Sequence, residues 1–102
     1  MIIKKEKRIA ERPRLEYSQD GRGGTVTYIA GTTKINFDWE FAGGAGVAII
    51  FIPEEKFWLA HTHTPVSARN SILTFVAKQV IGDKAPGCVY EITENCIEIL
   101  YK

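Results

Sequence analysis

The clearest pattern in the chain is a strict alternation of apolar and polar residues between positions 34 and 41. Every second position of this stretch holds a large apolar side chain, namely Ile35, Phe37, Trp39 and Phe41. Successive side chains of a β-strand point to opposite faces, so all four lie on one face, and that face must be covered. A second alternating stretch at 25–30 precedes Gly31-Thr32, which suits a tight turn. Residues 25–41 are therefore predicted to form a β-hairpin.

Two further stretches extend the predicted sheet. Residues 47–52 (VAIIFI) are apolar on both faces, which is typical of a central strand, and the glycines within 43–46 form the turn before it. Pro53 ends that strand, and residues 57–63 (FWLAHTH) are predicted as another strand with a polar end. Residues 17–24 are dense in turn formers, so the folded body is expected to start near Leu15.

The hydrophobic period changes after residue 64. Apolar residues then recur with helical spacing at Leu73, Val76, Ala77 and Val80. Thr64 and Pro65 suit the N-cap and the first position of a helix, and Gly82 suits the residue that ends one. We therefore expect a helix between Pro65 and Gly82, with Arg69 on its solvent side.

The last fifteen residues or so predict a second β-hairpin. Residues 88–93 and 96–101 are strand-like and flank the turn at Glu94-Asn95. Pairing around this turn sets Ile92 opposite Ile97 and Tyr90 opposite Ile99. The same register sets two like charges, Glu91 and Glu98, directly opposite each other, and a cation or a partner's basic group would relieve their repulsion.

These elements predict an α+β fold. An antiparallel β-meander of about five strands carries one helix packed on its aromatic face, and a C-terminal β-hairpin follows. Residues 1–14 form a basic N-terminal segment, with six basic and two acidic side chains, and residues 15–102 form a single α+β domain.

Composition narrows the class of protein. With 102 residues, 45% of them hydrophobic and 25% charged, the chain suits one soluble globular domain. Nucleic-acid-binding domains usually carry a strong excess of basic residues, whereas the formal net charge of this chain is only +1. No nucleic-acid partner is therefore expected. No apolar run reaches the roughly 20 residues of a membrane helix, so no membrane partner is expected either. The predicted hairpin register places Cys88 and Cys96 too far apart for a disulfide bond. Two free thiols are typical of a reducing compartment, so we expect the protein in the cytoplasm.

His61 and His63 are the first candidate site. On a strand, alternate residues point the same way, so the two imidazoles could share a metal ion, although a zinc site needs a further ligand that the sequence does not place. Alternatively, both histidines, Arg69 and the start of the helix could hold a phosphate or carboxylate. A small metal- or anion-binding enzyme centred on His61 and His63 is thus one hypothesis for function.

The second candidate site is the polar face of the central hairpin, which carries Asn36, Asp38 and Glu40. No motif for nucleophilic catalysis or phosphate binding is present, and no cofactor is implied. We therefore favour a non-catalytic module that binds another protein through this face or through the corner from His61 to Arg69. In size and layout the chain is similar to small immunity and inhibitor proteins of bacterial toxin systems. A regulatory subunit, which also acts by binding another protein, is the other type of module we expect. A homodimer joined through an edge strand is a further hypothesis.

Overall fold

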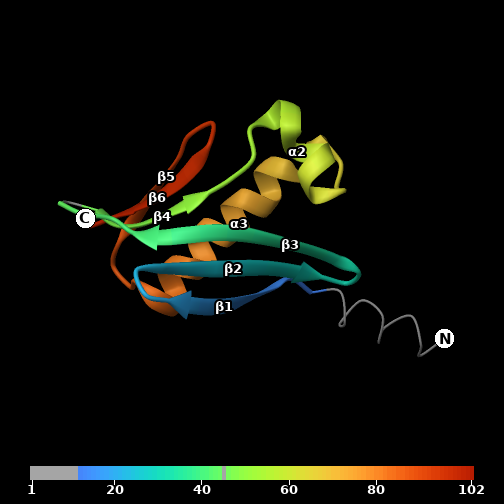
Figure 1. The fold of residues 1–102 in the computed structure, drawn as a ribbon. Helices are drawn as coiled ribbons and strands as arrows, with labels where there is room; N and C mark the ends of the chain where they lie inside the picture. The colour runs from blue at the N-terminus through green and yellow to red at the C-terminus, as the bar shows by residue number, and fades with distance from the viewer. Residues whose placement is uncertain (1–11, 45) are drawn as a thin grey trace.

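A computed structural model describes residues 12–44 and 46–102, which form a six-stranded antiparallel sheet with helices packed on one face (Figure 1). The strand order is β1-β2-β3-β4-β6-β5. The elements, in chain order, are β1 Arg14–Asp20, β2 Gly23–Ala30, β3 Thr33–Phe41, β4 Gly46–Phe51, α2 Glu55–Thr62, the 3₁₀ turn η1 Val66–Ala68, α3 Arg69–Lys84, β5 Val89–Ile92 and β6 Cys96–Leu100. This architecture confirms the α+β class, with a meander sheet and a C-terminal hairpin. The predicted basic segment 1–14 lies almost wholly outside the described residues.

The central hairpin is formed by β2 and β3, as the alternation predicts. Val26 pairs with Phe37 and Tyr28 with Ile35, so that all four side chains lie on the same face of the sheet. Gly31 adopts a positive φ of 61° in the turn between the strands, a backbone conformation that glycine tolerates without strain. Phe37 is only 2% exposed, which shows that this face is covered.

Helix α3 covers that face, crossing the sheet as Figure 1 shows. Its buried side presents Leu73, Val76 and Ala77, each at most 1% exposed. Trp58 of α2 adds a second cover, because its ring stacks on Phe37 with centroids 6.4 Å apart. Sheet and helices therefore share one core, formed from the single apolar face that each contributes.

The C-terminal hairpin joins the main sheet. Strand β6 pairs with β4, which makes both of them interior strands, and β5 forms the outer edge. The hairpin has the predicted register, with Ile92 opposite Ile97 and Tyr90 opposite Ile99. Ile97 and Ile99 are fully buried, so the hairpin completes the same core.

The strand predicted at 57–63 is wrong, because residues 55–62 form helix α2. Only Trp58 and Thr62 of this helix are buried, and their spacing of four residues is one helical turn. The Thr62 hydroxyl donates to the Trp58 carbonyl at 2.7 Å, which further ties this turn together. The meander itself therefore has the four strands β1–β4, and β1 includes residues 17–20 that the sequence assigned to a turn.

The predicted helix bounds are also corrected. Pro65 precedes the 3₁₀ turn η1, and α3 proper begins at Arg69. The hydroxyl of Thr64 caps no helix, because it donates to the Thr62 carbonyl at 3.0 Å. At the other end the helix runs through Gly82 to Lys84, and the backbone N–H of Ala85 closes it on the Ile81 carbonyl. None of the helices in residues 12–44 and 46–102 has the length and apolarity needed to cross a membrane.

The register confirms that Glu91 faces Glu98 across the last hairpin. Replacing Glu91 with Gln removes this repulsion, so we expect the free energy of unfolding to rise by about 0.3–1 kcal/mol. Urea denaturation monitored by tryptophan fluorescence measures the change. Glu94→Gln, in the turn of the same hairpin, is the matched control, and an unchanged or lower stability for Glu91→Gln contradicts the assigned pairing.

Candidate functional site

The sheet face opposite the helices is uncovered in the described part of the chain. Cross-strand partners point to the same side of a sheet, so the register identifies the residues of this outer face. One row of partners runs from Glu40 through Ile49 and Glu98 to Glu91. A parallel row runs from Glu16 through Thr27 to Asn36.

The outer face is strongly acidic. Its six acidic side chains are Glu16, Asp20, Asp38, Glu40, Glu91 and Glu98, whereas its two basic ones are Arg14 and Lys34. Six negative and two positive charges give this face a net charge of −4, whereas the other described residues hold four acidic and seven basic side chains, a net charge of +3. Charge is therefore segregated onto one side of the described domain.

Three of the predicted site residues lie on this outer face, all of them exposed: Asn36, Asp38 and Glu40. The Thr27 hydroxyl donates to the Asn36 side-chain oxygen at 2.7 Å, which fixes the amide across two strands. In the described ranges Asp38 and Glu40 form no ion pair, since the salt bridges there join Arg14 to Glu16 and Lys56 to Glu54. Both carboxylates are therefore available to a partner.

The sheet splits beside these residues. Strand β4 pairs with β3 only along residues 39–41, and then it follows β6, with Phe51 opposite Cys96. The backbone N–H of Phe41 donates to the Arg22 carbonyl at 2.8 Å. Alternate residues of a strand direct their backbone N–H and C=O groups to opposite sides, so the odd-numbered residues of β3 form their backbone hydrogen bonds with β2. By the alternation of an antiparallel ladder, Lys34 and Asn36 direct their backbone groups into the opening, where the described residues supply no strand.

A depression of about 270 Å³ lies at this split. It brings Asn36 and Asp38 together with His61, and the remaining lining is Phe37, Phe51, Ile52 and Pro53. The predicted residues Glu40 and His63 do not line it. Three residues that the sequence assigned to two separate candidate sites therefore line one depression.

The two histidines are not arranged as the strand prediction required. His61 lies on α2, exposed, with its ring 6.3 Å from that of Phe57, whereas His63 is the C-cap of the helix at φ 56° and ψ 31°. Alternate residues of a helix do not point the same way, so the expected shared face is wrong. The described residues contain no group of three or more histidine, cysteine or acidic side chains positioned to hold a metal ion.

Arg69 is buried, although the helical pattern placed it on the solvent side. Its guanidinium donates to the carbonyl oxygens of Pro53 and Glu94, both at 2.9 Å, and lies 5.8 Å from the centre of the Trp58 ring. It therefore links α3 to the segment before α2 and to the turn of the last hairpin. The anion site proposed from the sequence therefore lacks the Arg69 guanidinium, because this group is buried and donates to backbone carbonyls instead.

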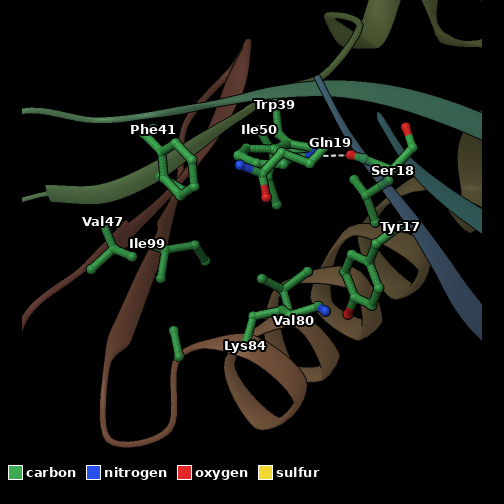
Figure 2. A pocket seen from close by; sticks show the side chains of 13 residues that line it. Tyr17, Ser18, Gln19, Trp39, Phe41, Val47, Ile50, Val80, Lys84 and Ile99 are labelled. Atoms are coloured by element: carbon green, nitrogen blue, oxygen red, sulfur yellow. Dashed lines mark hydrogen bonds between the residues drawn. The ribbon is translucent and has the colours of Figure 1, made fainter. Parts of the chain in front are cut away.

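A second concavity, which the sequence analysis missed, lies between the inner sheet face and the C-terminal end of α3 (Figure 2). It has a volume of about 360 Å³. We call it the sheet–helix cavity, and its lining is Tyr17, Ser18, Gln19, Val26, Trp39, Phe41, Val47, Ala48, Ile50, Val80, Lys84, Ala85 and Ile99. The sequence pattern that could have predicted this cavity is the row of apolar residues on β3. This row continues to Trp39 and Phe41, beyond the part of the strand that α3 covers.

Polar groups gather at one side of this cavity. The Tyr17 hydroxyl donates to the Asp83 carboxylate at 2.7 Å, and the Lys84 ammonium lies 4.6 Å from the centre of the Tyr17 ring. Burial of the phenol raises the pKa of Tyr17, and the hydrogen bond to Asp83 and the charge of Asp83 raise it further. The phenol therefore keeps its proton, and with it this hydrogen bond, throughout the physiological pH range.

Comparison of the chain with protein-family models, with curated proteins and with solved structures finds no match. The observations that bear on function are therefore the geometry and charge of the described residues.

The burial of Arg69 makes a testable prediction. Arg69→Met keeps a long apolar stem but removes both hydrogen bonds to carbonyl oxygens, so we expect a loss of about 2–4 kcal/mol in the free energy of unfolding. Urea denaturation measures it, with exposed Lys78→Met on the same helix as the control, expected within about 0.5 kcal/mol of the unmodified chain. If Arg69→Met is as stable as this control, Arg69 does not hold the elements together.

Proposed function

We propose that this protein is a non-catalytic binding domain that takes a basic surface of another protein onto its acidic outer sheet face. The observation that carries the proposal is the net charge of −4 on a sheet face that the described residues leave uncovered. Such a domain is of the immunity, inhibitor or regulatory-subunit type.

Electrostatics supports a basic partner in particular. Complementary charge speeds encounter and selects against partners of the wrong sign. The Glu91 and Glu98 side chains face each other at a cost, and a partner's Lys or Arg set between them removes that cost on binding. Two copies of this face repel each other, which disfavours a homodimer through it and leaves the edge strands β1 and β5 for that hypothesis.

The split between β3 and β4 supports a protein rather than a small ion as the partner. Free backbone groups at Lys34 and Asn36 suit an extended segment, which pairs with them as an added strand. Exposed Phe51, at 44% exposure, and His61 flank this opening and give the segment apolar and polar side-chain contacts.

The alternative, a metal- or anion-binding enzyme centred on His61 and His63, receives less support. The buried Arg69 guanidinium already donates to two carbonyl groups, and His61 lies within a helix whereas His63 is its left-handed C-cap. For location we propose the cytoplasm, which the free thiols of Cys88 and Cys96 support.

Charge reversal on the outer face tests the proposal. The double variant Asp38→Lys with Glu40→Lys should lower affinity for a basic partner by at least about tenfold, because it replaces attraction by repulsion at the centre of the interface. Partners captured from a lysate of the source organism are purified, and titration calorimetry at two salt concentrations gives their dissociation constants. The double variant should fold as stably as the unmodified chain, since it relieves repulsion within the face.

Ser71→Lys, which adds a positive charge at an exposed position of α3 on the helical side of the sheet, is the control and should bind normally. The expected partner is basic, and its affinity falls as salt rises. A partner that is acidic, or that binds the double variant as well as it binds the unmodified chain, sinks the proposal. Recovery of no partner at all counts against it too.

A further inference from the structure

We propose that the sheet–helix cavity binds a small apolar carboxylate, with the apolar body of the ligand inside and its carboxylate at Lys84. This second site goes beyond the protein-binding function. It shares no lining residue with the depression at the sheet split, so the two sites fail or succeed independently.

The interior of the cavity suits an apolar body. Its floor is formed by Val26, Ile50 and Ile99, core residues that are each at most 2% exposed. The volume of about 360 Å³ falls in the range of small-molecule sites, roughly 300–1,000 Å³. The apolar surface left for a ligand to cover belongs to Phe41, which is 43% exposed, and to the half-buried Trp39 and Val47, and its removal from water favours binding.

Fixed side chains hold the cavity open. The Trp39 indole N–H donates to the Ser18 carbonyl at 3.1 Å, and the Trp39 ring meets Phe41 edge to face with centroids 5.0 Å apart. Gly24 pairs with Trp39 across the strands, and a Cβ at Gly24 would collide with the Ser18 carbonyl. The missing side chain thus permits a close approach of β1 and β2 that helps to fix the Trp39 wall opposite α3 (Figure 2).

The mouth of the cavity offers one cation. In residues 12–44 and 46–102 the Lys84 ammonium takes part in no salt bridge, and it lies beside Tyr17 (Figure 2). The neighbouring Asp83 carboxylate already accepts hydrogen bonds from Tyr17, at 2.7 Å, and from Gln79, at 2.9 Å. The Asp83 carboxylate and the C-terminal carbonyls of α3 oppose negative charge here, so this one ammonium suits a monovalent carboxylate better than a phosphate.

Octanoate and 1-octanol test this proposal, because they share an apolar chain and differ in charge. Titration calorimetry and amide chemical shifts of the whole protein should show that octanoate binds more tightly, with shifts concentrated at Ser18, Gln19 and Lys84. Lys84→Gln should weaken octanoate binding by roughly 3- to 10-fold and leave 1-octanol binding unchanged. Lys78→Gln, an exposed lysine of α3 that does not line the cavity, is the matched control and should change neither.

A cavity-filling variant locates the site. Ala48→Phe places a ring in the cavity and should abolish binding of both probes, with Ala48→Leu as the milder substitute if the first does not fold. Binding of neither probe to the unmodified protein overturns the proposal, as does binding that survives the filled cavity. Equal affinity for the two probes, unaffected by Lys84→Gln, overturns the assigned recognition of a carboxylate.

Discussion

The structure depends on the one-sided burial of strand β3. Its inner residues lie against α3 and the Trp58 ring of α2, and its outer residues stay in solvent. A strand with this alternation admits one register, because a shift by one residue would expose Phe37 and bury Asp38. Every neighbouring strand is aligned from β3 outward, so the same constraint decides which side chains of β1, β2, β4, β5 and β6 face the helices.

The helices of the described chain cover part of that inner face and none of the outer one (Figure 1). On the inner side α3 ends before it reaches Phe41, which stays 43% exposed, and the sheet–helix cavity lies at this margin. On the outer side the register gathers six carboxylates from four strands. Both proposed sites are thus consequences of a two-layer fold whose single helical layer is shorter than its sheet.

The sequence predicted the parts of the fold that follow a strict period. Both hairpins and the facing pair Glu91 and Glu98 were predicted because neighbouring residues decide them. Helix α2 was missed because only two of its eight residues are buried, too few to show a period. The burial of Arg69 depends on carbonyls 16 and 25 residues away, and the full charge of the outer face depends on where β6 joins the sheet. Such long-range partners leave no local pattern.

The proposed binding of a basic partner requires that the outer sheet face is open and negatively charged in solution. Proton relaxation by matched cationic and anionic paramagnetic cosolutes measures local charge and access together at individual residues. We expect the cationic cosolute to relax the protons of Thr25, Asn36 and Glu98 several-fold more strongly than the anionic one does, with little difference at the exposed α3 residue Ser71. Equal relaxation by the two cosolutes on the sheet face, or weak relaxation by both, would contradict it.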